Sequence, residues 1–502
     1  MNIQPAWQET FDFFGPVNII IEPSQAQLSS DAGLLPIRQF DQRLGLTRSF
    51  ADVLDDPRDP DQIDHTVLDM VRARVYGILA GYADQNDHDT LRHDPVFKLI
   101  ADRSPTAGDL ASQPTLSRFE NAINIPSLKR LRDVFIDQFI ASFDTPPRHL
   151  TFDLDAVDDP AHGSQQLTFW HNYYDQNQYL PLLITCADND QLVMFCLRHG
   201  SCHAALGADA DLAYLVGRLR CVWPDVAISA RADAAFGVPD MYDICESLRI
   251  NYTFGLTTNA VLKRRSDMLL AQASADWALE QHAAHAAQRP AQPVRLFDGF
   301  AYRAGSWPAD RWVVVKAEAN AAGTNRRFIV TNRPGAVVVP GATYDEYALR
   351  GESENRNKEF KCDLAMDRLS DQRFLANLFR LYLHAAALNL LIRLRQQVAL
   401  PALPVAPAAA PTGATADAPL PAAALDGAER VRYFRQRRQR DPLGEGHPCT
   451  WRLLFIKVAA EVLVSSRRIV VRLSASWPHL PAFQQVCARL RGQPPQPAFE
   501  TG

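Results

Sequence analysis

His149-Leu-Thr-Phe-Asp-Leu-Asp155 alternates polar and apolar residues as a half-buried β-strand does, and this stretch decides the fold class. Residues two apart on a strand point the same way, so Asp153 and Asp155 share one face. Before this stretch the chain has helical periodicity, whereas short strands and helices follow it. Further strands are predicted at 166–173, 179–185, 191–197, 226–230 and 251–255, with helices at 208–221 and 239–248. This order indicates a mixed α/β layer with some antiparallel hairpins.

Residues 1–145 have the pattern of a helical domain, and a DNA-binding role is our hypothesis for them. Apolar residues between Ile63 and Leu79 follow a period of 3.6 residues. Pro114 and Pro126 each open a further helix, and the short connection between them is typical of a helix-turn-helix-like cluster. The polar residues here that can face phosphates are Ser117, Arg118, Lys129, Arg130 and Arg132. An ordinary helical domain with a solvated charged face explains the same spacing equally well.

The chain beyond residue 257 divides into four further segments. Residues 258–345 combine a short helix at 274–286 with three strand-like runs, the pattern of an inserted, mostly β subdomain. A charged helix at 344–367 and a longer apolar helix at 371–397 come next. The predicted boundaries are 1–145 (helical), 146–257 (first part of the α/β domain), 258–345 (inserted subdomain), 346–398 (helices completing the α/β domain), 399–425 (Ala/Pro linker) and 426–502 (basic segment).

Composition restricts the class of protein. A chain of 502 residues exceeds a single core, and its net charge of −5 hides an asymmetry. Residues 426–502 carry 13 Lys and Arg against 6 Asp and Glu, a net of +7, which leaves −12 on the remainder. The eight cysteines lack C-x-x-C spacing, which argues against a disulfide framework and a zinc module. With no signal-like N-terminus and no uncharged apolar run of membrane-spanning length, we expect a cytoplasmic protein with no membrane partner.

Two hypotheses describe the basic segment. Six arginines between Arg430 and Arg440 follow a linker rich in Ala and Pro, which favours a flexible arm that holds positive charge near DNA. The apolar run from Leu453 to Val464 favours docking on the rest of the protein instead. The tethered arm is the prediction adopted here. It implies that truncation at residue 398 lowers non-specific DNA affinity, most visibly at low salt, without destroying a metal site elsewhere in the chain.

Four acidic residues stand at positions suited to metal chemistry. Asp153 and Asp155 lie at the end of the first strand, Asp233 follows the strand at 226–230, and Glu354 lies in the charged helix. Mg²⁺ takes hard oxygen ligands, and two such ions can flank one phosphodiester. Aspartates are also common wherever a loop leaves a strand, so these positions alone leave both interpretations open.

The charged helix adds a second pattern. Tyr347, Arg350, Glu354 and Lys361 are spaced by three, four and seven residues, so on one continuous helix their side chains would fall within roughly a 60° sector. Glutamate can bind an ion there, while arginine and lysine can bind phosphate oxygens and tyrosine can stack or hydrogen-bond. A solvated surface helix accounts for the same stripe.

The spacing Tyr-x2-Arg-x3-Glu-x6-Lys resembles the signature of a large class of bacterial insertion-sequence transposases, which have an RNase H-like catalytic fold and an Asp-Asp-Glu triad. Further stretches are similar to the thirteen-eighty group of that class. They are Leu28-Ser-Ser-Asp-Ala-Gly-Leu-Leu35, Gly81-Tyr-Ala-Asp-Gln-Asn-Asp87, Asp153-Leu-Asp-Ala-Val-Asp-Asp-Pro-Ala-His-Gly163, Tyr302-Arg-Ala-Gly-Ser-Trp307 and Arg350-Gly-Glu-Ser-Glu-Asn355. The similarity spans residues 28 to about 400, and residues 453–477 also look related.

The resemblance implies roles for particular residues. Asp155, Asp233 and Glu354 would be the catalytic carboxylates, and they would hold two Mg²⁺ ions, with Mn²⁺ as a possible substitute. Asp153 competes with Asp155 for the first place. Tyr347, Arg350 and Lys361 would contact DNA phosphates. Val157 and the pair Ala234-Ala235 depart from the group's usual Thr and Ser-Gly, which affects fine geometry rather than the ligands.

Two residues outside the triad carry weaker expectations. The resemblance suggests that Trp307, in the inserted β unit, holds a base turned out of the duplex, whereas packing inside a small β domain is the simpler explanation. His162 could touch phosphate or metal-bound water, although ordering of the turn after the first strand is the favoured interpretation.

The expected function is DNA transposition by phosphoryl transfer. Cleavage at the transposon end would free a 3′-hydroxyl, which would then attack a second phosphodiester. Terminal inverted repeats and target DNA would be the partners, a homodimer would form on DNA, and the protein would be nucleoid-associated in a bacterium. The alternatives are a non-catalytic DNA-binding regulator derived from such an enzyme and a two-metal nuclease without strand transfer.

Overall fold

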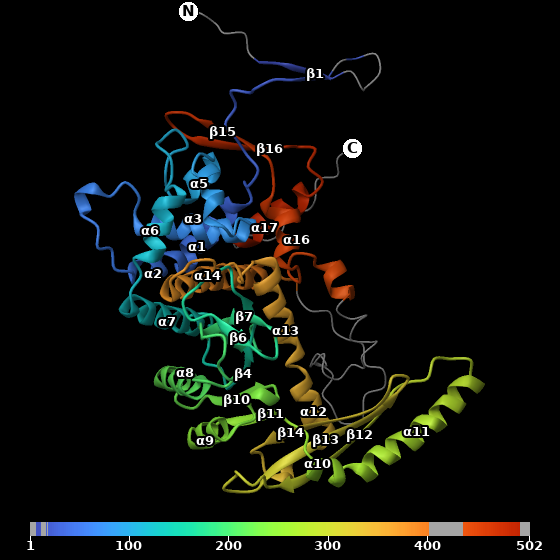
Figure 1. The fold of residues 1–502 in the computed structure, drawn as a ribbon. Coiled ribbons are helices and arrows are strands. Elements are labelled where there is room, and N and C mark those ends of the chain that lie inside the picture. Colours follow the sequence, from blue (N-terminus) through green and yellow to red (C-terminus); the bar gives the residue numbers. More distant parts are fainter. Residues whose placement is uncertain (1–6, 12–16, 18, 401–434, 492–502) are drawn as a thin grey trace, which may run out of the picture.

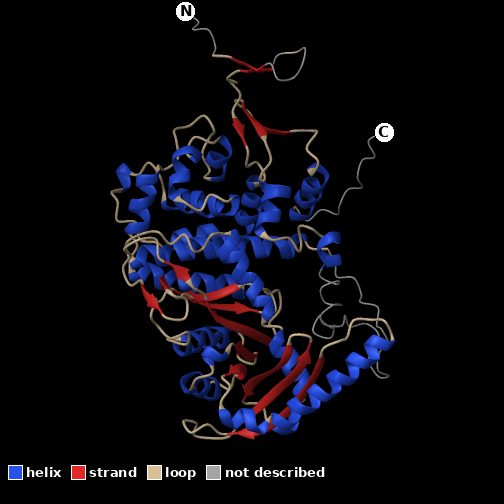
Figure 2. Ribbon diagram, turned by 45° about the vertical axis from the view of Figure 1, so that its right-hand side comes forward, coloured by secondary structure: helices blue, strands red, loops and turns tan. Residues whose placement is uncertain are grey.

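The computed structural model describes residues 7–11, 17, 19–400 and 435–491. Helices from both ends of the chain form one layer, and a large mixed sheet with its own helices forms the other (Figures 1 and 2). The predicted mixed α/β class is confirmed. Most of the predicted linker and the arginines at 430 and 432 lie outside the described residues.

An eight-stranded sheet forms the centre of the α/β layer, in the order β12-β13-β14-β11-β10-β4-β8-β9. Its middle strands, β4, β10 and β11, run parallel and are largely buried, whereas β8, β9 and β14 pair antiparallel with their neighbours. The bounds of the five strands at this end are β4 His149–Ala156, β8 Leu182–Cys186, β9 Leu192–Cys196, β10 Ala227–Ala232 and β11 Asn251–Leu256. A separate small sheet, in the order β5-β7-β6, holds β5 (Asp159–Pro160), β6 (Phe169–His171) and β7 (Gln176–Tyr179).

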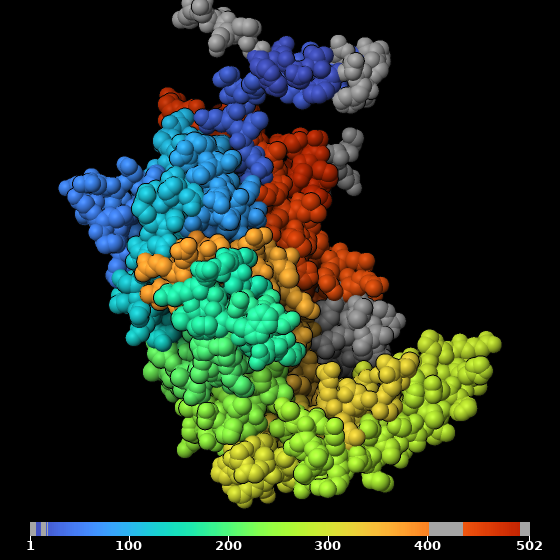
Figure 3. Space-filling model, viewed as in Figure 1, coloured from blue at the N-terminus to red at the C-terminus, as the bar shows by residue number. Residues whose placement is uncertain are grey.

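Residues 258–345 continue the central sheet. The three strands are β12 Val294–Tyr302, β13 Arg311–Asn320 and β14 Gly323–Thr331, and β14 pairs with β11. One face of these strands is covered by α11 (Asp267–Ala286), which is longer than the predicted helix at 274–286. The opposite face packs against α12 (Pro340–Ala348) through Val314, Ile329 and Tyr344. The strands and α11 together form a wing at one end of the sheet (Figures 1 and 3).

The helical layer is assembled around α14 (Phe374–Val398), which is apolar on nearly every side and almost wholly buried. Among the described residues, it is the one helix that is long and apolar enough to cross a membrane. Because most of it is buried inside the protein, it is the core helix between the two layers. The helices of residues 1–145 pack in this layer, and Pro114 and Pro126 stand in the first turns of α6 and α7 as predicted. Their bounds are α1 Leu34–Leu44, α2 Leu46–Asp52, α3 Val67–Ala80, α5 Pro95–Ile100, α6 Gln113–Asn121 and α7 Ile125–Ile140.

Residues 441–491, here called the C-terminal module, dock on the N-terminal helices (Figure 3). Trp451, Phe455 and Ile456 are at most 1% exposed. A Cβ atom at Gly33 would lie 1.9 Å from the carbonyl oxygen of Phe455, so the two backbones meet too closely for any side chain at that glycine. The tethered-arm prediction is therefore wrong for this part of the segment, because its apolar residues complete a core.

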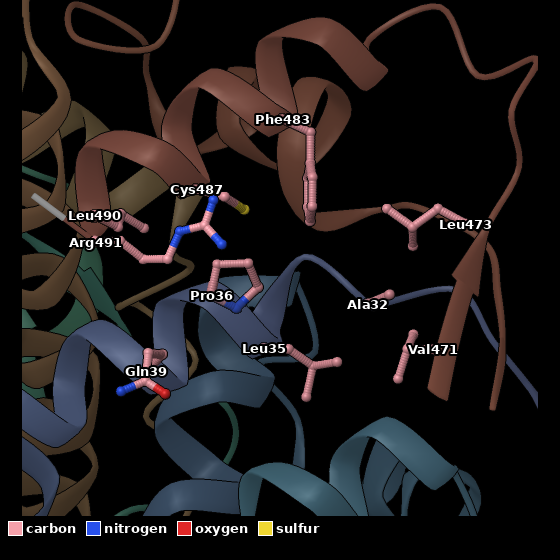
Figure 4. A pocket seen from close by; sticks show the side chains of 10 residues that line it. All are labelled: Ala32, Leu35, Pro36, Gln39, Val471, Leu473, Phe483, Cys487, Leu490 and Arg491. Atoms are coloured by element: carbon pink, nitrogen blue, oxygen red, sulfur yellow. The ribbon is translucent and has the colours of Figure 1, made fainter. Parts of the chain in front are cut away.

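Further docking contacts involve the strands and the last helix of the C-terminal module. Strand β15 (Ala460–Val464) pairs with β3 (Leu28–Ser29) on one side and with β16 (Ile469–Leu473) on the other. Helix α17 (Leu480–Leu490) faces α1 across a cavity of about 320 Å³. Figure 4 shows its mainly apolar lining, which includes Leu35, Leu473 and Phe483. The interface is thus extensive but not fully packed.

Docking predicts that Trp451→Ala destabilises the whole protein. The indole is buried, and its Nε1 donates to the carbonyl oxygen of Leu443 at 2.8 Å. We expect a loss of about 3–5 kcal/mol in the free energy of unfolding, measured by urea denaturation. Leu453→Ala is the matched control, because Leu453 in the same segment is 69% exposed. Equal, small losses in both variants would contradict docking.

Candidate active site

Two neighbouring parallel strands bring Asp155 and Asp233 to the same edge of the sheet. In the register of β4 and β10, Asp153 is opposite Arg231 and Leu154 is opposite Ala232. Asp155 and Asp233 come next on their strands, after Leu154 and Ala232. Each is two residues beyond Asp153 or Arg231, so all four side chains lie on the same face of the sheet. The Asp233 carboxylate contributes to raising the pKa of Asp155, which shows that the two acids are close.

Asp153 itself forms a buried ion pair. Its two carboxylate oxygens accept hydrogen bonds from Nε and Nη2 of Arg231 at 2.7 and 2.8 Å, and both side chains are at most 5% exposed. Arg231 also donates to the carbonyl oxygen of Glu346 at the end of α12. Asp153 therefore couples two strands and a helix, and the structure places it beneath the other acids rather than among them.

The third carboxylate, Glu354, is carried by α13 (Gly351–Lys358). Its side chain is 46% exposed and is paired with Arg350 at 3.0 Å. Arg350 interacts electrostatically with Asp155, Asp233 and Glu354 alike. The structure thus brings the three sequence-predicted carboxylates together around one guanidinium, and Tyr347 lies beside that guanidinium at 6.0 Å.

The carboxyl group of Asp155 has a perturbed pKa. Burial raises its pKa to about 6, the charge of Arg350 opposes this rise, and the charges of Asp233 and Glu354 add to it. Its oxygens accept hydrogen bonds from the backbone N–H of Ala156 at 3.0 Å and from Nδ2 of Asn357 at 2.8 Å. Sequence reasoning missed Asn357, although its position three residues after Glu354 places it on the same helix face.

The helix that carries the signature residues is not continuous, so the predicted helix at 344–367 is wrong in detail. Helix α12 ends at Ala348, α13 begins at Gly351, and a π-helical turn, η5 (Glu359–Asp363), follows. The extra residue of a π-turn rotates the side chains beyond it. Lys361 therefore leaves the common face and pairs with Asp158 at 2.8 Å. Tyr347, Arg350 and Glu354 remain together, whereas Lys361 lies at the margin.

Burial of Glu359 accompanies the π-turn. Its carboxylate is 1% exposed and is paired with Arg356 and Arg395, each at 2.8 Å, and with His447 at 2.9 Å. These partners belong to α13, α14 and the C-terminal module. Although burial opposes it, this cationic surrounding lowers the pKa of Glu359 to about 2. The end of the Glu354 helix is thereby fixed to both layers.

The remaining sequence-predicted residues lie elsewhere. Trp307 is 5% exposed and packs edge-on against Tyr242 and Tyr302. This agrees with a packing role for Trp307 rather than with holding a flipped base. A ring nitrogen of His162 lies 2.6 Å from the carbonyl oxygen of Asp367, which agrees with an ordering role in its turn. Arg118 and Lys129 are exposed on α6 and α7, while Arg130 of α7 is paired with Asp55 at 2.7 Å.

Tyr174 is a further residue that sequence reasoning missed. Burial raises its pKa to about 12, and the charges of Asp158, Asp155 and Asp233 contribute. Its phenol therefore lies beside the acidic cluster and stays protonated at neutral pH. No motif singled it out, because it stands in a loop between two short strands.

The donor chemistry of the cluster fits a hard divalent cation. Asp155, Asp233 and Glu354 offer only oxygen atoms, which Mg²⁺ prefers, and their mutual repulsion is visible in the raised pKa of Asp155. Within the residues that the structure describes, however, no three His, Cys, Asp or Glu side chains already stand in a metal-binding arrangement. The third carboxylate, Glu354, is paired instead with Arg350, a cation of the protein itself.

The perturbed pKa of Asp155 predicts a pH-dependent stability. Because the folded pKa of about 6 exceeds the usual value near 3.9, this contribution to stability is fully present below pH ~4 and is lost as pH rises through 6. In chelator-treated protein, Asp155→Asn should exceed wild type by about 2 kcal/mol at pH 7.5 and match it near pH 4. Urea denaturation at several pH values measures this, with the exposed Asp240→Asn as control. Parallel profiles for Asp155→Asn and wild type would contradict the coupling.

The buried Asp153–Arg231 pair makes a separate prediction. Asp153→Asn should cost about 3–5 kcal/mol of folding stability, because it leaves a buried guanidinium without its counter-charge. Arg231→Met in the same chain should recover part of that loss, as measured by thermal and urea denaturation. Additive losses in the double variant would mean that the two side chains do not act as a pair.

One family model matches most of the chain. The family model described as "Transposase DDE domain group 1" matches residues 17–410, a span that contains all three clustered carboxylates. Among curated proteins, none matches this chain significantly.

Proposed function

Since this chain belongs to the Transposase DDE domain group 1 family, we propose that it is a DNA transposase that cuts at transposon ends and joins the freed 3′-hydroxyl to DNA. The observation that carries the proposal is the convergence of Asp155, Asp233 and Glu354 from two strand ends and one helix. DDE transposase domains generally use divalent metal ions, and we assign Mg²⁺ here, with Mn²⁺ as a substitute. The motif similarities favour the thirteen-eighty group of insertion sequences and an RNase H-like catalytic fold.

The residues of the chain divide the work among them. Asp155 and Asp233 lie at strand ends and supply two of the carboxylates. Glu354 supplies the third when it leaves its ion pair with Arg350 and binds the metal ion instead. Asn357 orients Asp155 by donating to one of its oxygens. Freed from Glu354, Arg350 can bind a phosphate oxygen near the reacting bond. Two bound divalent ions would activate the attacking oxygen and stabilise the leaving one.

DNA is the partner that the family implies, and particular contacts are part of the proposal. Arg118 and Lys129 are exposed on α6 and α7 and are assigned to DNA phosphates in the helical layer. Tyr347 and Arg350 are assigned to the DNA end at the active site. Two ends must be held together for transposition, so we propose a homodimer on DNA. Arg130, Lys361 and Trp307 have intramolecular partners and are not assigned to DNA.

The proposal predicts that Asp233→Ala and Glu354→Ala abolish cleavage while binding of transposon ends stays within about threefold of wild type. Each change removes an ion ligand and leaves the DNA-binding surfaces intact. Asp240→Ala, an exposed acid in the first turn of α9 (Pro239–Ser247), is the matched control and should cleave normally. The measurement is cleavage and strand transfer on a labelled duplex that carries the cognate end, in the presence of Mg²⁺ or Mn²⁺.

The same assay separates the alternative functions. End binding without cleavage by wild-type protein would indicate a DNA-binding regulator. Cleavage without joined product would indicate a nuclease. Cleavage by either triad variant at the wild-type rate would refute the assignment of the carboxylates.

A further inference from the structure

The cations that the sequence signature brings to this site are already paired with acids. Arg350 is held by Glu354 at 3.0 Å, and Lys361 is held by Asp158 at 2.8 Å. Releasing Arg350 depends on rearrangement of Glu354, and Lys361 lies at the margin. A DNA strand that approaches three clustered carboxylates therefore meets negative charge unless other cations flank them.

Arg327, on β14, is one exposed cation beside the site. In the β13–β14 register it stands directly opposite Lys316, and like charges in opposite positions destabilise a sheet. Lys316 is paired with Glu318 at 2.8 Å. Within the described part of the chain, Arg327 has no carboxylate or hydrogen-bond partner. The positive charge of Arg327 is therefore retained at a position where, next to Lys316, a neutral residue would make the sheet more stable.

The surroundings of Arg327 connect it with the acidic cluster. Its charge acts on Tyr344 and Tyr347, whose rings are 5.9 Å apart on α12. Tyr347 in turn interacts electrostatically with Arg350 and Asp233. Arg327 and α12 lie on the same face of the wing, because Ile329, two residues along β14, packs with Tyr344.

Lys358 is a second exposed cation on the other side of Glu354. It stands four residues after Glu354, at the last position of α13, so both side chains belong to one helix face. Within the described residues it too lacks a carboxylate partner. Tyr347, which Arg327 neighbours in space, lies two turns before Glu354 in the chain. Lys358 lies one turn after Glu354.

We propose that Arg327 and Lys358 bind backbone phosphates of the DNA strand on the two sides of the reacting bond. This inference rests on the proposed function and deepens it by naming the protein's contacts to its substrate. The contacts are electrostatic and independent of base sequence. They also supply positive charge that does not depend on release of the internal ion pairs.

The salt dependence of DNA affinity tests the proposal. Affinity for a pre-cleaved end duplex is measured between 50 and 200 mM salt for wild type, Arg327→Gln, Lys358→Gln and the double variant, with chelator present so that nothing is cut. Each lost phosphate contact should reduce the slope of log affinity against log salt by about 0.9, and the double variant should lose about twice that. Arg327→Lys should keep the wild-type slope because it keeps the charge.

Matched controls come from the neighbouring basic residues that are paired. Arg326, next to Arg327, points to the other face of β14 and is held by Asp267 at 2.7 Å. Arg356, two residues before Lys358, is held by Glu359 at 2.8 Å. Arg326→Gln and Arg356→Gln should lower thermal stability and leave the salt slope unchanged.

Wild-type slopes in Arg327→Gln and Lys358→Gln would overturn the proposal, and so would an equal loss of slope in the control variants. Failure of the proposed function shows differently. Wild-type protein would then bind ends with normal salt dependence but give no cleavage in Mg²⁺ or Mn²⁺. Binding and chemistry are thus tested separately.

Discussion

The buried ion pair between Asp153 and Arg231 is the constraint on which the candidate site depends. It joins two parallel strands directly opposite each other, and a shift of one residue in this register would turn one partner to the other face of the sheet. With the register fixed, Asp155 and Asp233 must emerge together at the same edge. The same guanidinium donates to the carbonyl oxygen of Glu346, so α12 is held against the strand ends as well. This one buried ion pair therefore positions Asp155 and Asp233, and it also positions α12, which leads to the helix that carries Glu354.

A second constraint acts on the far end of the Glu354 helix. Glu359 gathers Arg356, Arg395 and His447, which belong to α13, α14 and the chain beyond residues 401–434. A buried carboxylate with too few cations would cost several kcal/mol, so these partners must stay together for the fold to persist. The π-turn allows both Glu359 and Phe360 to face the interior, where each is at most 2% exposed. The C-terminal module therefore contributes to the layer of the candidate site through packing and charge rather than as a mobile basic arm.

Much of this could be predicted from the sequence, and the exceptions have physical causes. The strand at 149–155, the strands of the wing and the helices opened by Pro114 and Pro126 follow from local periodicity and turn chemistry. The proximity of Asp155, Asp233 and Glu354 followed from a signature and from strand-end logic. The π-turn could not be predicted, because it depends on burial of Glu359 by residues 36 and 88 positions away in the chain. The apolar run at 453–464 indicated docking of the C-terminal module, but the charge in residues 430–440 favoured the arm, and the close contact at Gly33 could not be read from local pattern.

The electrostatics of the site explain why the protein tolerates an arrangement that opposes its own stability. Burial raises the pKa of Asp155 to about 6, and the charges of Asp233 and Glu354 add to this rise. The positive charge of Arg350 partly offsets this repulsion from within the cluster. An internal cation of this kind cannot also be free for substrate, which is why Lys361 and Arg350 are poor candidates for the first encounter with DNA. Arg327 and Lys358 lie at the edge of the site, on elements that the core holds in place, and have no carboxylate partner among the described residues. They can contact a DNA strand without breaking an internal ion pair. On the proposed function, the repulsion within the acid cluster and the unpaired positive charge at its edge are two parts of one arrangement, in which bound DNA and its ions would supply the missing counter-charges.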